Sequence, residues 1–147
     1  MELIKKIEIY HKEITDLFEN IRLREALQKI LELSAEGNKY LQDNKPWELL
    51  KTDRNRADTV LYMSANLCLN LAILVQPFLP NTSKKVFEQL GVKGEEFVWA
   101  DGNKINLPKT HTIRYAEILF KQIDKEKIDE LKNTVTKPTP LEEIFGK

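Results

Sequence analysis

A chain of 147 residues, 41% of them apolar, is long enough for one domain with a hydrophobic core and too apolar for a disordered protein. Lys and Arg together number 23, as do Asp and Glu, so the domain as a whole has no net charge with which to attract nucleic acid or a membrane. Its 5 glycines and 6 prolines are few, which favours helices over a turn-rich β sandwich.

The N-terminal third of the chain reads as two amphipathic helices. Apolar residues recur at steps of three and four over residues 3–21, which predicts a helix that breaks at Asn20 and Ile21. The same spacing starts again at Leu23 and predicts a second helix that runs to about residue 41.

A short polar stretch separates these two helices from the rest of the chain. Residues 41–45 are predicted to form a turn. Pro46 suits the first position of a short helix, because an N–H at that position would have no acceptor within the helix. Thr52 or Asp53 is then expected to cap the start of the next helix, since both residue types accept a hydrogen bond from helical N–H groups.

The third segment is apolar over most of its circumference, which is typical of the central helix of a bundle. Pro77 is expected to end this helix, and Pro80 or the residues just after it to begin another. Gly91 is placed to end that last helix in the left-handed conformation.

The sequence after Gly91 has no clean period. We expect residues 92–124 to form loops or short strands packed across a bundle core of residues 1–91, and residues 125–147 to form a charged helical stub and a linker. The predicted fold class is therefore all-α, a bundle of about four to five helices with an irregular C-terminal tail, and the predicted domain is 1–124.

Cysteine use and hydropathy indicate the cellular setting. The single cysteine, Cys68, makes neither an intrachain disulfide nor a zinc site, and its apolar neighbours predict that it lies in the core. The first residues lack the continuous apolar core of a secretory signal, and the longest apolar run, residues 71–80, is interrupted and too short for a bilayer. We therefore expect a cytoplasmic protein.

Catalytic patterns are hard to find. His11 and His111 are the only histidines, nothing pairs them with a nucleophile, and we interpret both as surface or packing residues. The chain has no Gly-rich phosphate loop and no Cys/His spacing for a metal, so no cofactor or metal site is expected in it.

Binding is the function that the residues do suggest, around one tryptophan. Trp47 follows the polar turn, with Asn38 and Tyr40 before it and Lys45 and Lys51 beside it. An aromatic ring that stacks on an unpaired base contributes about 1–3 kcal/mol, while amides and cations reach base edges and phosphates. The alternative is that Trp47 fixes the short helix to the bundle and Asn38 caps a helix end, and composition alone favours this packing role.

Three further residues have a structural interpretation. Trp99 is expected to pack the tail against the bundle. Arg54 and Arg56 are flanked by Asp residues and are expected to form ion pairs at the start of the long helix rather than to reach phosphates.

Two stretches together resemble a known family. "GNKYLQDNKPWELLK" followed by "LCLNLAILVQPFLPNTSKKVFEQLGV" is similar to the C-terminal anticodon-binding domain of methionyl-tRNA synthetases, with its Asn-x-Tyr, its Pro-Trp and its long apolar helix ending in Pro-Phe-x-Pro. "ILFKQID" resembles the closing feature of that domain. The resemblance implies that Trp47 stacks on an anticodon base and that Asn38 and Tyr40 lie near it.

The resemblance also implies partners and a parent reaction. The partners would be methionine tRNA, read at its CAU anticodon loop, and the catalytic domain of the same enzyme, with no membrane and no DNA. That domain would bind ATP with magnesium and methionine, and its motifs are not in this chain, nor is the helix that carries the other anticodon-reading Asn and Arg of the family. We therefore expect weak tRNA binding by this chain alone. The alternatives are the anticodon-binding domain of another class I synthetase and a stand-alone helical protein-interaction adaptor.

Overall fold

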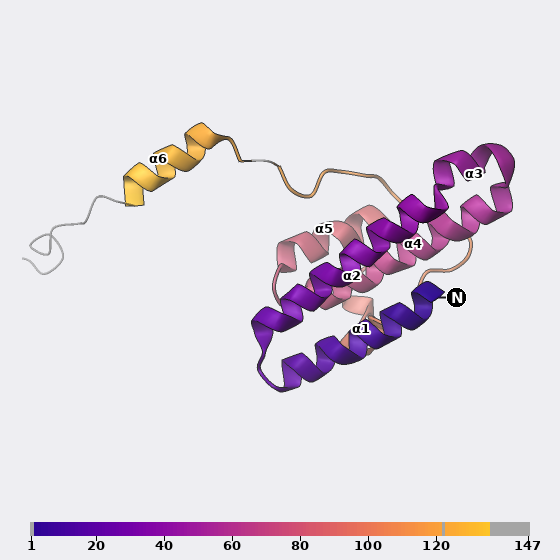
Figure 1. Cartoon of the computed structure of the whole chain (residues 1–147), viewed down its shortest axis with the longest axis horizontal. Coiled ribbons are helices and arrows are strands. Elements are labelled where there is room, and N and C mark those ends of the chain that lie inside the picture. Colours follow the sequence, from indigo (N-terminus) through magenta and orange to yellow (C-terminus); the bar gives the residue numbers. More distant parts are fainter. Residues whose placement is uncertain (1, 122, 136–147) are drawn as a thin grey trace, which may run out of the picture. The chain divides into compact units, whose positions relative to one another are not determined.

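The computed structural model describes residues 2–121 and 123–135. The chain divides into two compact units, residues 1–117 and 118–147. Among the described residues, the first unit holds five helices and two short 3₁₀ turns, and the second holds one helix (Figure 1). The helices are α1 (Glu2–Glu19), α2 (Leu23–Asn44), α3 (Pro46–Thr52), α4 (Arg54–Val75), α5 (Pro80–Leu90) and α6 (Lys125–Val135), and the turns are η1 (Gly94–Glu96) and η2 (Trp99–Asp101).

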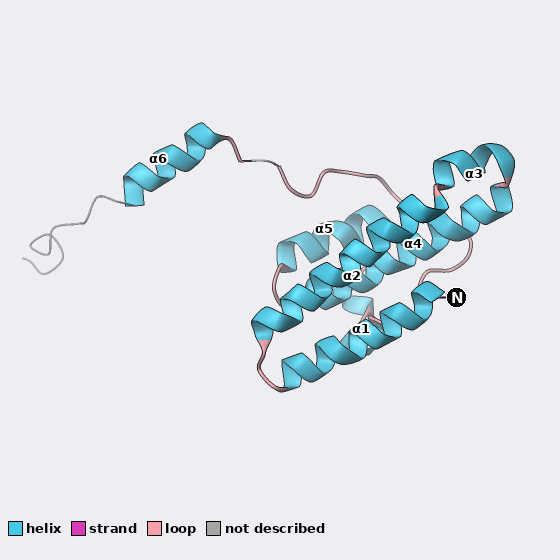
Figure 2. Cartoon of the chain, viewed as in Figure 1, coloured by secondary structure: helices cyan, strands magenta, loops and turns pink. Residues whose placement is uncertain are grey.

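No strand occurs among the described residues, so the predicted all-α class is confirmed (Figure 2). The described residues of the tail after α5 form 3₁₀ turns and loops. Of the two predicted alternatives, loops or short strands, the structure has the loops. The first unit continues to Glu117, and the described residues from Ile118 onward belong to the second unit, which includes α6.

Helix α4 lies at the centre of the first unit, as predicted. One core cluster joins α4 to α1 and α2, and its members with almost no exposure include Ile7, Ile14, Leu33 and Leu74. A second cluster joins the other side of α4 to α5 and the tail through Leu69, Phe87 and Leu107. By length and composition α4 is apolar enough to cross a membrane, a test that the core helix of a bundle also passes.

The helix ends follow the predicted residues at three places. Ile21 adopts a φ of 59° between α1 and α2, where the break was expected. The Asp53 carboxylate accepts a hydrogen bond from the Arg56 N–H at 3.0 Å and caps α4. Gly91 ends α5 with a φ of 75°, a conformation that costs glycine little because it has no Cβ.

The predicted turn at residues 41–45 is wrong, because α2 continues to Asn44. The Asn44 side chain donates to the Tyr40 carbonyl at 2.9 Å, and the Lys45 N–H donates to the Leu41 carbonyl at 2.8 Å. Lys45 alone then reverses the chain, with φ 43° and ψ 63°. The sequence did not show this, because a left-handed lysine at a helix end is unusual.

Two buried asparagines of α4 hold the tail. The Asn66 side-chain oxygen accepts hydrogen bonds from the N–H groups of Asn106 and Leu107, both at 2.9 Å. The Tyr62 hydroxyl donates to the Leu107 carbonyl at 2.6 Å. Asn70 faces the Asn106 amide at 3.5 Å. The expected packing of the tail on the bundle therefore combines the apolar contacts of the second cluster with hydrogen bonds from polar side chains of α4.

Cys68 corrects another prediction, because its side chain is exposed and not in the core. Its sequence neighbours Leu67 and Leu69 are both buried, but each lies about 100° around the helix from it, on a different side. The apolar run correctly indicates that most of α4 is buried, but it does not show that Cys68 faces solvent.

Candidate nucleic-acid interface

The predicted site lies where α2, α3 and α4 meet, at one end of the first unit (Figure 1). Lys45 turns the chain in the left-handed conformation, and Pro46 follows as the buried first residue of α3. The Trp47 side chain comes next and is 48% exposed. A rigid corner with a buried proline therefore presents the indole to solvent instead of burying it.

Two exposed residues share the side of α3 on which Trp47 lies. Lys51 is four residues further on and Leu50 is three, and such positions are neighbours on a helix surface. Leu50 is 46% exposed. The structure thus brings together an aromatic plane, an apolar edge and a cation within one helix of seven residues. Leu50 was missed in the sequence, where it reads as an ordinary core position.

Lys45 lies beside this cluster but is already paired. Its ammonium is 3.2 Å from a carboxylate oxygen of Glu48, and both side chains are more than half exposed. Exposed ion pairs of this kind contribute about 0–1 kcal/mol, so a phosphate can replace Glu48 as partner at little cost. Glu48 lies in the first turn of α3, and its carboxylate holds the lysine that turns the chain.

Asn38 and Tyr40 occupy different positions relative to Trp47. Asn38 is exposed and lies in the interior of α2, so its alternative role as a helix cap is wrong. It is about 10 Å along the helix axis from Lys45. Tyr40 is half-buried and packs against the first core cluster, and burial raises the pKa of its hydroxyl while the charge of Arg56 lowers it. Tyr40 therefore has a packing role whether or not RNA binds.

The two arginines at the start of α4 differ. Arg54 forms the expected ion pair, with its Nε 3.6 Å from Asp58. Within the described part of the chain, Arg56 has no carboxylate at ion-pair distance, and Asp53 accepts its backbone N–H. The predicted ion-pair role therefore holds for Arg54 and is wrong for Arg56, whose guanidinium is an exposed cation near Tyr40.

The histidines have packing roles, as expected. His11 is buried, with its Nε2 3.0 Å from the Trp99 carbonyl oxygen. The Nε2 of His111 is 2.6 Å from the Leu90 carbonyl oxygen. Within the described residues, no group of three or more His, Cys, Asp or Glu side chains is placed to hold a metal ion.

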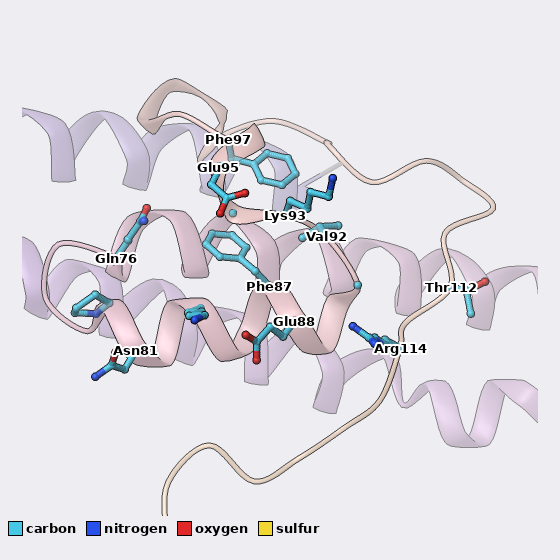
Figure 3. A pocket seen from close by; sticks show the side chains of 14 residues that line it. Gln76, Asn81, Phe87, Glu88, Val92, Lys93, Glu95, Phe97, Thr112 and Arg114 are labelled. Carbon is cyan, nitrogen blue, oxygen red and sulfur yellow. The ribbon is translucent and has the colours of Figure 1, made fainter.

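A cavity of about 1060 Å³ lies elsewhere, between α5 and the tail. Figure 3 shows Phe87 and Phe97 on one side of it, with rings stacked at 6.1 Å, and Arg114 on the other. Its lining carries three cations, Lys84, Lys93 and Arg114, and two carboxylates, Glu88 and Glu95.

Comparison with known proteins identifies the family. A family model for the anticodon-binding domain of methionyl tRNA ligase matches residues 1–137. Similar proteins include methionine–tRNA ligases of Pyrococcus horikoshii, 36% identical over 86% of this chain, Sulfolobus acidocaldarius, 33% identical over 94%, and Bacteroides fragilis, 36% identical over 87%.

The match covers a small part of each relative. It spans 17% of the Pyrococcus protein, 25% of the Sulfolobus protein and 19% of the Bacteroides protein. The all-α bundle with its packed tail is the fold that the resemblance in the sequence implied. This chain belongs to the family of methionyl-tRNA ligase anticodon-binding domains.

Proposed function

We propose that this chain recognises the CAU anticodon loop of methionine tRNA and that Trp47 provides the surface on which one unpaired base stacks. The observation that carries the proposal is the 48% exposure of the Trp47 side chain at a rigid helix corner. Proteins read single-stranded RNA loops by stacking splayed bases on aromatic rings and by hydrogen bonds to their edges.

Neighbouring residues supply the remaining contacts. Lys51, on the same side of α3 as Trp47, approaches a loop phosphate, and Lys45 exchanges Glu48 for another. The exposed amide of Asn38 can hydrogen-bond to a base edge, whereas Tyr40 packs against the first core cluster next to the corner. Because the chain has no net charge, the grip on RNA is local, and we expect this chain alone to bind tRNA weakly.

We infer the parent reaction from the resemblance in the sequence and from the relatives, which are methionine–tRNA ligases. In a complete methionine–tRNA ligase, a separate catalytic domain joins methionine to its tRNA in the cytoplasm with ATP and magnesium. The present domain supplies discrimination between tRNAs and no chemistry. Its contribution is therefore visible in the tRNA-dependent step and not in amino-acid activation.

A Trp47→Ala change in the complete ligase tests the proposal. We expect kcat/KM for aminoacylation to fall about fivefold to about 150-fold, which corresponds to the ~1–3 kcal/mol of one stacked base, while ATP-dependent activation of methionine is unchanged. Trp47→Phe is the control, because it keeps an aromatic plane and should retain most of the activity. Equal loss of both activities would show that Trp47 supports folding and does not read RNA.

A further inference from the structure

Another cavity, of about 540 Å³, lies at the same end of the first unit as the Trp47 corner (Figure 1). Its volume is within the range of about 300–1,000 Å³ that is typical of ligand-binding clefts. Asn44, the last residue of α2, lines this cavity and is three residues from Trp47, so their Cα atoms are at most about 11 Å apart. We call it the corner cleft, and the residues that line it come from α1, α2 and α4 and include Leu3, Tyr40, Asn44, Thr59 and Met63.

The inner wall of the corner cleft is apolar and includes one aromatic ring. Leu3 is buried, and Ile4, Tyr40 and Met63 are half-buried. Tyr40 of α2 and Met63 of α4 both pack against the first core cluster, which holds them in place. An aromatic ring and a thioether both favour contact with an aromatic ligand.

Two hydrogen-bonding groups next to this wall have no partner in the described part of the chain. One is the hydroxyl of Tyr40, which forms no hydrogen bond there. The other is the side-chain oxygen of Asn44, whose amide N–H donates to the Tyr40 carbonyl at 2.9 Å while the oxygen accepts nothing. Half-buried polar groups without a partner gain a hydrogen bond when a polar ligand enters, so the cleft favours a ligand with donors and acceptors at its edge.

The charges around the corner cleft favour an anionic group at its mouth. Lys6 of α1 and Glu36 of α2 form an ion pair at 2.6 Å and offset each other. Lys39 and Asp43, one turn apart on α2, are both exposed and of opposite sign. Arg56 is then the cation in excess, and among the described residues it has no carboxylate at ion-pair distance.

Arg56 lies at the mouth of the cleft. It is three residues before Thr59 and seven before Met63, so all three side chains share one side of α4, with Arg56 nearest the corner. Burial raises the pKa of the Tyr40 hydroxyl and the charge of Arg56 lowers it, which indicates that the guanidinium is close to that hydroxyl. An exposed arginine without a carboxylate partner is well suited to bind a phosphate through two N–H groups.

We propose that the corner cleft is a second nucleotide subsite, which takes the base of the unpaired RNA nucleotide next to the one on Trp47, with a phosphate of that nucleotide on Arg56. The inference rests on the proposed function, because one loop must reach both places. The base contacts the apolar wall, and its edge bonds to the Tyr40 hydroxyl and the Asn44 amide. Proteins read splayed loop bases by this combination of stacking and edge hydrogen bonds. The chain therefore reads two neighbouring nucleotides and not one.

A comparison of two arginines tests the phosphate contact. In the complete ligase, Arg56→Ala should weaken the binding of methionine tRNA about threefold and reduce the dependence of log K on log salt concentration by about 1. Arg54→Ala is the matched control, because Arg54 is exposed on the same helix and is paired with Asp58, and it should leave both quantities nearly unchanged. Equal effects of the two substitutions, or no effect of Arg56→Ala, would overturn the phosphate contact.

Thr59→Trp tests the base contact, because Thr59 is exposed and a larger side chain there closes the cleft without disturbing the core. The probe is methionine tRNA with one abasic nucleotide, moved through the anticodon loop position by position. Thr59→Trp should weaken the binding of intact tRNA to the complete ligase about fivefold or more, as expected for one lost base contact. This effect should vanish at one abasic position, adjacent to the position at which the effect of Trp47→Ala vanishes. An unchanged thermal midpoint is the control for folding.

Two results would overturn the second subsite and leave the proposed function intact. One is an affinity of the Thr59→Trp ligase for intact tRNA equal to that of the unchanged ligase. The other is cancellation of the effects of Thr59→Trp and Trp47→Ala at the same abasic position. Failure of the proposed function looks different, because Trp47→Ala would then leave tRNA binding unchanged, and this result would overturn both.

Discussion

The two tryptophans of this chain lie in contrasting environments. Trp99 packs in the tail, where its indole N–H donates to the Thr15 hydroxyl at 2.9 Å and its ring meets Phe18 edge-on at 5.0 Å. Trp47 is half exposed at the α2–α3 corner, and none of the described residues forms a hydrogen bond with its indole. A solvent-exposed indole contributes little to the stability of the fold, and its ring is accessible to a ligand.

The contrast also separates two kinds of polar support. On the Trp99 side, buried amides and a capped turn bind the tail to α4, and their removal affects folding. On the Trp47 side, the ion pairs are exposed and add little stability. The polar contacts on the Trp99 side are therefore expected to contribute more to stability than those on the Trp47 side.

The largest expected effect comes from comparing the two tryptophans directly. We expect Trp99→Ala to lower the free energy of unfolding by about 3 kcal/mol, because it opens a cavity and removes the hydrogen bond from the indole N–H to the Thr15 hydroxyl. Trp47→Ala should cost less than about 1 kcal/mol. Urea unfolding followed by circular dichroism measures both. A larger loss for Trp47 than for Trp99 would reverse the comparison.

Replacing an asparagine on the Trp99 side should likewise lower the free energy of unfolding more than replacing one on the Trp47 side. Asn66→Ala removes the acceptor for two N–H groups of the tail, and we expect a loss of about 2 kcal/mol with faster hydrogen exchange at Asn106 and Leu107. Asn38→Ala, on an exposed helix position, should be within about 0.5 kcal/mol of the unchanged chain. Unaltered exchange in the Asn66 variant would mean that the tail is held by apolar contacts alone.

Lys51 and Lys45 at the corner test whether the Trp47 side contacts tRNA phosphates. In the complete ligase, Lys51→Ala should weaken tRNA binding about threefold and reduce the dependence of log K on log salt concentration by about 1, as expected for one lost phosphate contact. Lys45→Ala should do less, because that lysine gives up its pair with Glu48 on binding. The measurement is tRNA affinity at several salt concentrations, and an unchanged slope in both variants argues against phosphate contacts here.

The smallest effect is a pH dependence on the Trp99 side. The backbone N–H of Val98 donates to the Asp101 carboxylate, and with the nearby Lys104 it lowers the pKa of Asp101. A lowered folded-state pKa means stability that is present above the unfolded pKa and lost as pH falls through the folded value. We expect Asp101→Asn to lose less stability than the unchanged chain between pH 6 and pH 3. Parallel acid profiles would show that this turn does not contribute.

Much of the fold was predictable from local patterns. Apolar spacing predicted α1 and α2, Asp53 predicted the start of α4, and Gly91 predicted the end of α5. These features depend on residues within a few positions of one another. The predicted turn at residues 41–45 failed because the choice between a helical turn and a loop there depends on one left-handed lysine and on a buried proline.

The candidate site was predictable in part. The Pro-Trp pair identified Trp47, but its exposure depends on how α3 lies against α4, which no local pattern contains. The ion pair predicted for Arg56 was wrong and the exposed Leu50 was missed, because whether a cation meets a carboxylate, or a leucine is buried, depends on how the helices pack.

The sequence by itself determined the helices, their order and the family of this chain, because periodicity, caps and short motifs are local properties of the polypeptide. Only the tertiary structure decided which of two indoles is packed, that Cys68 is exposed, and which side of α4 lacks a cover in the described residues. The physical reason is that burial is a relation between segments far apart in the chain, and an apolar residue has the same local signature on a covered side as on an open one.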